Sequence, residues 1–302
     1  MRRLLLVVNV NAQTVTPAAL GIITRALSSE FRVEQVRTEG RGHATRLAAG
    51  ATAEGFDLVV AFGGDGTVNE VVNGIAGGDL PLAILPGGGA NVFARSLGIP
   101  RDPIEAAVAL LERLGEGPRR VSLGRIDGRW FAANCGVGLD AAIVRRVEQR
   151  QFAKRAVGDG FFVWSALRVL ASGYDRRTPH LALRWGEGAD ERREGLFLVV
   201  AQNIDPYTYL GERPIRLCPE AGGDGLDCIA LDSLAVRTVG RTVVGMFGRG
   251  ARGPHALHLA GRTLLCVESD APAPVHVDGE FVGERERVEI SAVPGALAVL
   301  GA

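Results

Sequence analysis

The sequence predicts an α/β fold in which an N-terminal doubly wound parallel-sheet domain is followed by a C-terminal antiparallel β-sandwich domain. Strand-like and helix-like segments alternate as far as residue 114, the run Gly115–Pro118 breaks this rhythm, and the remainder consists mostly of strand-like runs. We place the boundary near residues 122–128. This gives a first domain at residues 1–123 and a second at residues 124–302, with the last strand free to return to the first domain.

The first half begins with a strand-like run at residues 3–10, which leads into asparagines without a cleavage site and is therefore not typical of a signal peptide. Thr16 followed by Pro17 predicts an N-cap and a helix to about residue 28, and Asp102 followed by Pro103 predicts another to about residue 114. The remaining elements expected here are strands at 31–37, 58–62 and 82–85 and helices at 42–54, from Thr67 onward, and at 90–97.

In parallel sheets of this kind, ligands bind beyond the carboxyl ends of the strands. The candidate site therefore consists of four loops, at residues 9–13, 38–42, 63–67 and 86–91.

The third of these loops carries the strongest signal, because a buried strand ends at Gly63 and Gly64, and Thr67 and Glu70 are spaced as a capping box for the next helix. Glycines let backbone amides approach a ligand and a helix N-terminus favours anions, so we predict a nucleotide phosphate here. Asp65 would repel phosphate without a cation between them, which implies Mg²⁺. The alternative is a plain tight turn; the aligned strand, cap and acid favour phosphate.

The run GGDGTVNEVVNG resembles the nucleotide signature of the bacterial diacylglycerol kinase and lipid kinase family, whose catalytic domain is shared with sphingosine and ceramide kinases. TEGRGHATRLA resembles the part of these kinases in which a threonine, here Thr38, contacts the nucleotide, and PGGGANVFARSLGIP resembles their second glycine motif. The resemblance implies that the nucleotide is held by Asn9, Thr38, Gly63, Gly64, Asp65, Gly66, Thr67, Asn69, Glu70, Gly88, Gly89 and Asn91.

The second glycine motif departs from the family at two positions. The family usually has Thr or Ser where this chain has Gly89, and often Asp where it has Val92. A hydroxyl contact to phosphate is therefore absent, and backbone amides would serve instead.

The second half contains strand-like runs at residues 130–137, 180–185, 196–202, 227–231, 263–268, 275–282 and 288–291, interrupted by helical stretches at 140–171 and 238–247. The first helical stretch includes a basic run, Arg145 to Arg155, which predicts either a surface for anionic membranes or an ordinary solvated face.

Two glycine turns in the second half have both a functional and a structural interpretation. AGGDGLDC resembles the family's structural magnesium loop, which implies Mg²⁺ ligands at Asp224 and at the carbonyls of Ala221 and Leu226; a plain Asp-Gly hairpin turn is the alternative. In PVHVDGEFVG, Asp278-Gly279 is a strong hairpin signal, whereas the family keeps its catalytic acids in this motif, here Asp278 and Glu280. A site between the domains would bring these acids opposite Asp65.

Composition excludes several other classes of function. The formal net charge is zero, so we expect no nucleic-acid partner. The single lysine, Lys154, lies outside any glycine loop, which excludes a P-loop kinase. No apolar run approaches the roughly 20 residues of a membrane-spanning helix, so membrane contact is expected to be peripheral. The cysteines have apolar neighbours and no metal spacing, as in reduced core residues of a cytosolic protein.

Together, the motifs and the resemblance imply an ATP-dependent, Mg²⁺-requiring lipid kinase of phospholipid biosynthesis that phosphorylates the hydroxyl of a diacylglycerol-like lipid. The expected partners are this lipid, a peripheral membrane surface and, as an option, a second copy of the chain in a homodimer; the expected location is cytoplasmic and peripherally membrane-associated. Two alternatives stay open: an NAD kinase-like enzyme, which would share the GGDG core, and a nucleotide-binding regulatory protein without turnover.

Overall fold

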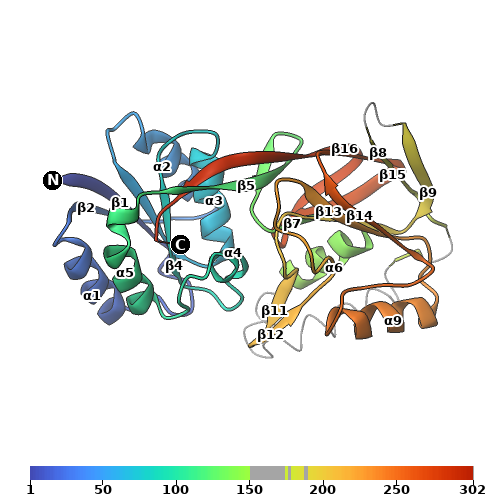
Figure 1. Ribbon diagram of the computed structural model, residues 1–302, viewed down its shortest axis with the longest axis horizontal. Helices are drawn as coiled ribbons and strands as arrows, with labels where there is room; N and C mark the ends of the chain where they lie inside the picture. Colours follow the sequence, from blue (N-terminus) through green and yellow to red (C-terminus); the bar gives the residue numbers. More distant parts are fainter. Residues whose placement is uncertain (150–173, 176–177, 187–189, 302) are drawn as a thin grey trace. The chain divides into compact units, whose positions relative to one another are not determined.

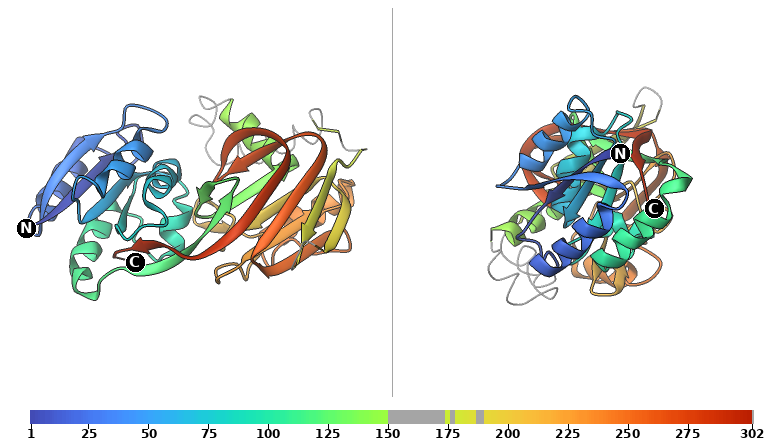
Figure 2. Two further views of the ribbon diagram at one scale, coloured as in Figure 1. Left: turned by 90° about the horizontal axis from the view of Figure 1, so that it is seen from above. Right: turned by 90° about the vertical axis from the view of Figure 1, so that its left-hand side faces the viewer.

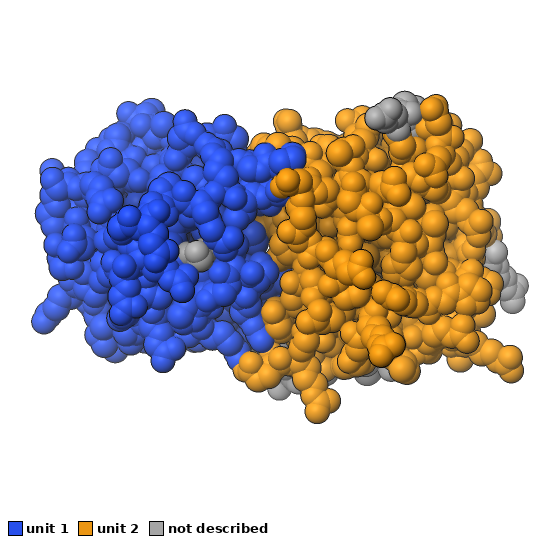
Figure 3. Space-filling model, in the orientation of Figure 1, with its two compact units in different colours: residues 1–123, 294–302 blue, residues 124–293 orange. Residues whose placement is uncertain are grey.

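The computed structural model describes residues 1–149, 174–175, 178–186 and 190–301. The chain divides into two compact units, unit 1 at residues 1–123 and 294–302 and unit 2 at residues 124–293 (Figure 3). Strands β5 (Arg119–Ile126) and β16 (Glu280–Val299) each begin in one unit and end in the other. The fold is mixed α/β, with a parallel sheet in the N-terminal part and antiparallel strands in the C-terminal part, as the sequence predicts.

Unit 1 contains a parallel sheet in the order β4-β3-β1-β2, and the end of β16 joins it beside β4. α1 packs against α5 and α2 against α3, and the two pairs cover opposite faces of the sheet (Figure 1). The elements are β1 (Arg2–Val8), α1 (Pro17–Leu27), β2 (Phe31–Arg37), α2 (His43–Ala51), β3 (Leu58–Gly63), α3 (Asp65–Ile75), β4 (Leu82–Pro86), α4 (Val92–Ser96), α5 (Pro103–Glu112) and the 3₁₀ helix η1 (Leu114–Glu116).

Local sequence signals position most of these elements. Every residue of β3 is buried, as expected for a central parallel strand covered on both faces. Thr16 caps α1 by accepting a hydrogen bond from the amide of Ala19, and Asp102 caps α5 by accepting from the amides of Ile104 and Glu105. Both predicted N-caps are therefore confirmed.

Unit 2 is built from antiparallel strands in the order β14-β13-β10-β7-β15-β16, with β8 and then β9 attached to β15. Figure 2 shows β15 and β16 as neighbouring curved strands. The elements are β6 (Arg129–Phe131), β7 (Asn134–Gly138), α6 (Leu139–Glu148), β8 (Leu181–Trp185), β9 (Glu191–Leu196), β10 (Leu198–Gln202), β11 (Thr208–Leu210), β12 (Arg213–Ile215), β13 (Leu226–Leu231), α9 (Val236–Met246), β14 (Ala256–Arg262) and β15 (Leu264–Val277).

The predicted strands of the second half differ from the observed strands in their number and bounds. Nearly all of the run expected at 263–268 and the first residues of the run expected at 275–282 lie in the 14-residue β15, whereas the rest of the second run forms the turn and the start of β16. β15 pairs with β8 near one end and with β7 near the other. A register shift between Glu268 and Ala273 lies between these two pairings. The exposed strands β9 and β14 were not expected, because their polar and glycine residues hide the alternation. The helix expected at 140–171 ends at Glu148 as α6, and its remainder lies outside the described residues.

Candidate functional site

The four candidate loops of unit 1 follow four parallel strands and therefore lie at the same edge of the sheet. The strand order reverses between β1 and β3, which is the topological switch point where such sheets bind ligands. There the amide nitrogen Nδ2 of Asn9 donates to the hydroxyl Oγ1 of Thr67 at 3.0 Å. Two predicted nucleotide residues from distant parts of the chain thus meet at the switch point.

The two glycine motifs are in direct backbone contact. The amide of Gly87 donates to the carbonyl of Gly63 at 2.7 Å. A Cβ atom added to Gly87 would lie 2.8 Å from the Cα of Gly63, and one added to Gly88 would lie 2.8 Å from the Cα of Gly64. Real Cβ atoms do not approach this closely, so these glycines are required by the packing of one loop on the other.

Gly66 and Gly89, in the same two motifs, make no such close backbone contact. A Cβ on Gly66 would have no neighbour within 4 Å, and one on Gly89 would meet the side-chain oxygen of Gln13 at 3.3 Å. Gly66 also lies in the first turn of α3 with an ordinary backbone conformation, where alanine would favour the helix. The protein's own packing does not explain the glycine at position 66, whereas a ligand that approaches the backbone would.

The carboxylate of Asp65 connects the two glycine motifs. Its Oδ1 accepts a hydrogen bond from the amide of Val92 at 2.6 Å, at the first residue of α4. An acid at a helix N-terminus is stabilised by the unpaired amides there. The Asp65 carboxylate thus has a structural contact in addition to the metal-binding role that the sequence predicts. Its oxygen atoms are hard ligands of the kind that Mg²⁺ prefers.

The predicted capping box of α3 is wrong. The N-cap of α3 is Gly64, which has no side-chain cap, and Thr67 instead accepts from Asn9. The carboxylate of Glu70 accepts from the amides of Gly42 at 2.8 Å and Ala44 at 3.0 Å, so it caps the neighbouring helix α2. The Thr-x-x-Glu spacing has the right form, but tertiary packing of α2 on α3 provides Glu70 with a better set of unpaired amides.

The other predicted nucleotide residues of unit 1 have the following places. Asn91 has a left-handed backbone and exchanges two hydrogen bonds with Gly88, at 2.9 and 2.7 Å, which fixes the second glycine turn. Asn69 is buried within α3, and its side-chain oxygen accepts from Asn73. Thr38 follows β2, and its amide donates to the carbonyl of Val8.

In unit 2, Asp278 and Gly279 form the two-residue turn of the β15–β16 hairpin, and both have positive φ, 47° and 76°. The hairpin interpretation is therefore confirmed. The Asp278 carboxylate accepts hydrogen bonds from three backbone amides, those of Ala132 and Ala133 at 2.8 Å and Asn134 at 3.0 Å. Asp278 thus fixes the segment between β6 and β7, and the catalytic role predicted for it stays a prediction.

Glu280 is the first residue of β16 and forms an ion pair with Arg129 at the start of β6. The pair is partly accessible, with 34% of the arginine side chain and 25% of the glutamate side chain exposed. The Glu280 carboxylate, beside the Asp278 turn, is therefore accessible to a ligand and lies next to a positive charge.

Sequence reasoning missed a buried polar cluster next to this turn. His276, completely buried, lies with Nε2 2.6 Å from Oδ2 of Asp140, and the hydroxyl of Tyr207 donates to Oδ1 of Asp140 at 2.9 Å. Burial, and then the Asp140 carboxylate, raise the pKa of Tyr207 well above its usual value, so the phenol stays protonated. The only available signal was the position of His276, two residues before Asp278 on the same face of a strand.

The predicted magnesium loop lies between β12 and β13. These two strands are not paired with each other, so the alternative of a plain hairpin at Asp224 is wrong. Asp224 is exposed, Leu226 begins β13, and the carbonyl of Ala221 accepts from the amide of Asp205 at 3.1 Å. Across the described part of the chain, no three His, Cys, Asp or Glu side chains cluster as a metal site, so Mg²⁺ here would depend on carbonyl and water oxygens.

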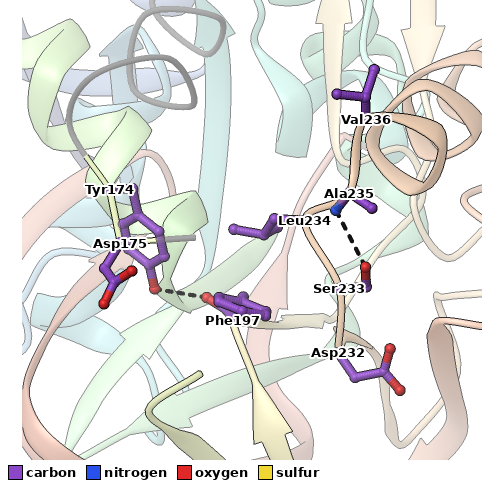
Figure 4. A pocket seen from close by; sticks show the side chains of 8 residues that line it. All are labelled: Tyr174, Asp175, Phe197, Asp232, Ser233, Leu234, Ala235 and Val236. Carbon is purple, nitrogen blue, oxygen red and sulfur yellow. Dashed lines mark hydrogen bonds between the residues drawn. The ribbon is translucent and has the colours of Figure 1, made fainter. Parts of the chain in front are cut away.

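A cavity of about 580 Å³ in unit 2 contains none of the predicted site residues. It is lined by Tyr174, Asp175, Phe197 and residues 232–236 (Figure 4). The Tyr174 hydroxyl donates to the carbonyl of Phe197 at 2.8 Å, and burial raises the pKa of Tyr174 to about 12. The wall opposite this tyrosine is the segment that leads into α9.

The basic run predicted at residues 145–155 lies only partly within the described residues, since residue 150 and those after it fall outside them. Arg145 forms an ion pair with Glu284 at 2.8 Å and lies over the ring of Phe281. Its charge is therefore engaged within unit 2.

Comparisons with known proteins agree with these motifs. The sequence pattern of the diacylglycerol kinase catalytic domain matches residues 3–126. The chain is 32% identical over 264 residues to a protein named "Probable lipid kinase YegS-like" from Pseudomonas aeruginosa, covering 85% of this chain and 81% of that protein. It is 29% identical over 294 residues to a diacylglycerol kinase of Mycobacterium tuberculosis, covering 94% and 89%.

A solved structure shares the fold. The crystal structure of a diacylglycerol kinase from Bacillus anthracis strain Sterne superimposes with a TM-score of 0.73 at 22% identity, covering 99% of this chain and 96% of that one.

Proposed function

Because the chain belongs to the lipid kinase family defined by the diacylglycerol kinase catalytic domain, we propose that it transfers the γ-phosphoryl group of ATP, with Mg²⁺, to the hydroxyl of a diacylglycerol-like lipid. Membership of the family supports a kinase that acts on lipids. The use of ATP, the use of Mg²⁺ and the identity of the lipid head group are what we propose.

The nucleotide site proposed is the edge of the unit 1 sheet at the switch point. The observation that carries it is Gly66, whose missing side chain leaves open space at the N-terminus of α3 although nothing in the protein requires it. Backbone amides at a helix N-terminus bind phosphate through their partial positive charge. This site is held in place by the hydrogen bond between Asn9 and Thr67 and by the backbone contact between the two glycine turns.

Mg²⁺ would be held at this site by Asp65 and would neutralise the charge of the transferred phosphoryl group. The Asp65 carboxylate is oriented by its hydrogen bond from Val92, so it does not need to be ordered when nucleotide binds. The donor is the backbone amide of residue 92, so the valine at a position where the family often has an acid keeps this contact.

The lipid hydroxyl requires a group that orients it and accepts its proton. We assign this to Glu280, because it is partly exposed and lies beside Arg129, and assign to Asp278 the task of holding the turn in place through three amides. The proton passes from the lipid hydroxyl to the Glu280 carboxylate as the new oxygen–phosphorus bond forms, while the bond between the γ-phosphorus and the β–γ bridging oxygen breaks and ADP leaves.

A lipid substrate also implies contact with a bilayer surface. No helix among the described residues is both long enough and apolar enough to cross a membrane. Contact at the surface of the bilayer, with or without a homodimer, is therefore the arrangement that we propose.

The test is phosphate transfer from radiolabelled ATP to a panel of acceptors: diacylglycerol, monoacylglycerol, sphingosine and NAD. We expect labelled product with diacylglycerol, dependent on Mg²⁺, and none with NAD. Labelling of NAD alone would establish the NAD kinase alternative. Binding of ATP without transfer to any acceptor would establish a regulatory protein. Asp65→Asn is the matched negative control, since it keeps an acceptor for the Val92 amide while removing the charge.

A further inference from the structure

The helix α9 of unit 2 has an apolar face that the described protein does not cover. No residue of α9 is buried. Four large apolar side chains are exposed on or just after it: Val236 at 81%, Val243 at 45%, Val244 at 75% and Phe247 at 52%. Three of them, Val236, Val243 and Phe247, are spaced by seven and four residues and so form one stripe along the helix, with Val244 beside it.

The helix is held mainly at its C-terminal end. The carbonyl of Met246 accepts from the amide of Arg216 at 2.8 Å, and the Met246 side chain packs against a small core that includes Leu217 and Ile229. Its N-terminal end has no side-chain cap. An 11-residue helix with two internal glycines is marginal on its own, because short helices gain most of their stability by packing an apolar face. Among the described residues, the stripe therefore lacks the apolar cover that would stabilise such a helix.

The charge beside the stripe indicates what this partner is. Arg237 and Arg241 are exposed and lie on the helix next to Val244, on the side away from the core. Among the described residues, neither of them forms an ion pair. The chain contains no Asp or Glu between Asp232 and Glu268, whereas Arg237, Arg241, Arg249, Arg252 and Arg262 all lie in this interval. Arg252 has an acidic partner from outside this interval, Glu220 at 3.9 Å. The segment that carries the stripe is therefore basic in sequence, although the whole chain is neutral.

An apolar stripe next to arginines is the pattern of a helix that lies in the plane of an anionic bilayer. We propose that α9 seats unit 2 on an anionic lipid surface, with Val243, Val244 and Phe247 among the acyl chains and Arg237 and Arg241 at the head groups. This rests on the proposed function to the extent that a kinase of lipids must reach a substrate that resides in a bilayer. It differs from the basic run at residues 145–155, whose Arg145 is engaged by Glu284.

The stripe begins at Val236, which also lines the cavity of unit 2 (Figure 4). A bilayer in contact with α9 would therefore meet a residue of the cavity wall. This continuity is an additional reason to choose a lipid surface over a protein partner.

The first measurement is sedimentation of the full chain with vesicles, in the absence of ATP. We expect binding to phosphatidylcholine vesicles that contain phosphatidylglycerol, much weaker binding to phosphatidylcholine alone, and release by salt, because salt screens surface charge. Arg237→Gln with Arg241→Gln should weaken binding roughly 30-fold, since each arginine near an anionic surface contributes about fivefold. Val243→Ser, Val244→Ser and Phe247→Ser together should weaken it by at least about tenfold.

The matched control is Ile22→Ser with Arg25→Gln on α1 of unit 1, where the isoleucine is 52% exposed, like Phe247. These changes remove the same kinds of side chain from another helix and should leave binding unchanged. A gain-of-signal variant, Phe247→Trp, should show a blue-shifted emission with anionic vesicles and quenching by brominated acyl chains, whereas Ile22→Trp should show neither.

Turnover separates this proposal from the proposed function. With diacylglycerol in anionic vesicles, the α9 variants should lose activity, whereas with a monomeric short-chain diacylglycerol they should keep it. Vesicle binding that the α9 variants do not change would overturn the role of α9, whatever the activity. A dimer in solution that the serine variants dissociate would also overturn it and would assign the stripe to a second copy. Absence of lipid phosphorylation by the unmodified chain would instead count against the proposed function alone.

Discussion

Asp65 in unit 1 and Asp278 in unit 2 both stand among glycines where a β-strand ends, yet their surroundings differ in kind. Asp65 begins a helix that follows a buried strand, and its carboxylate accepts a hydrogen bond from the amide of Val92. Asp278 occupies a hairpin turn, and its carboxylate accepts from three buried amides that precede it by about 145 residues. One acid is placed by its own strand and helix, and the other holds a distant segment in place.

This comparison teaches that an acid in a glycine motif need not be the acid that does the chemistry. Three amide donors on one carboxylate are typical of an anchoring role, because they orient the backbone around it. Glu280, two residues later, forms an ion pair with Arg129, and 25% of its side chain is exposed. These contacts are the basis for our proposal that Asp278 holds the turn and that Glu280 acts on the substrate.

The largest expected effect is on Glu280. Glu280→Gln should lower turnover by roughly 10²- to 10⁴-fold, because it removes a proton acceptor from the lipid hydroxyl. The free energy of unfolding should change by less than about 1 kcal/mol, since the ion pair with Arg129 is partly exposed. Turnover with monomeric short-chain diacylglycerol and urea unfolding measure the two quantities.

Arg129→Gln is the control for Glu280, because it breaks the same ion pair while keeping the carboxylate. It should lower turnover far less. Equal losses in the two variants would show that the pair, and not the acid, is needed, and Glu280 would lose its catalytic assignment.

Asp278→Asn should act chiefly on stability. Asparagine offers one oxygen where aspartate offers two, and its NH₂ group would face an amide donor, so one or more buried amides lose an acceptor. The free energy of unfolding should fall by about 1–3 kcal/mol in urea titration. Glu284→Gln, on the same strand, removes an exposed pair with Arg145 and should cost less than about 1 kcal/mol. If Asp278→Asn leaves the free energy of unfolding unchanged, Asp278 would again be a candidate catalytic residue.

Alanine at two glycines of the same loop should separate packing from ligand binding. Gly63→Ala would bring a Cβ within 2.6 Å of the Thr67 hydroxyl and should cost about 1–3 kcal/mol. Gly66→Ala meets no atom, so stability should hold or rise by up to about 1 kcal/mol. Only Gly66→Ala should raise the Michaelis constant for ATP without loss of melting temperature. Unaltered ATP kinetics in Gly66→Ala would remove the observation on which the nucleotide site depends.

Glu70→Gln tests the corrected capping assignment. The glutamine side chain keeps one acceptor oxygen for the backbone amides of Gly42 and Ala44 but loses the negative charge that a helix N-terminus favours. The free energy of unfolding should therefore fall by about 1 kcal/mol. Thermal unfolding measures this, with the exposed Glu39→Gln as control. No change in melting temperature would mean that α2 does not depend on this cap.

The smallest expected effect, counted per side chain, is a loss of stability at alkaline pH. It arises in unit 2, which contains all four cysteines. Burial raises the pKa of the Cys135 and Cys228 thiols and raises that of Cys218 to about 12. The unfolded chain then loses thiol protons above about pH 8.5 while the folded chain keeps them, so stability falls as pH rises from there toward 12.

Between pH 8 and pH 9 each such thiol should contribute a loss of about 0.7 kcal/mol to the free energy of unfolding. Urea titration at the two pH values measures the sum, and Cys218→Val should remove its share. A stability that is flat over this interval would mean that the thiols are accessible in the folded protein.

Local patterns in the sequence determined the parallel half of the fold. A short apolar run that ends at glycines, such as residues 58–62, is typical of a buried strand, and Thr16 and Asp102 mark helix starts because their oxygens reach amides within three residues. The local sequence also determined the type of turn at Asp278-Gly279, because both positions have positive φ and these two residue types favour it. For the same reason the sequence identified the loops that hold the candidate site.

Tertiary structure alone decided what the side chains at these places contact. Glu70 has the spacing of a cap for its own helix, but it binds amides 28 and 26 residues away because α2 packs beside it. The amides that hold Asp278, the buried contact between His276 and Asp140, and the uncovered stripe of α9 depend on which segments the fold brings together. Sequence periodicity reports which face of an element is apolar; only the folded chain determines whether another part of the protein covers that face.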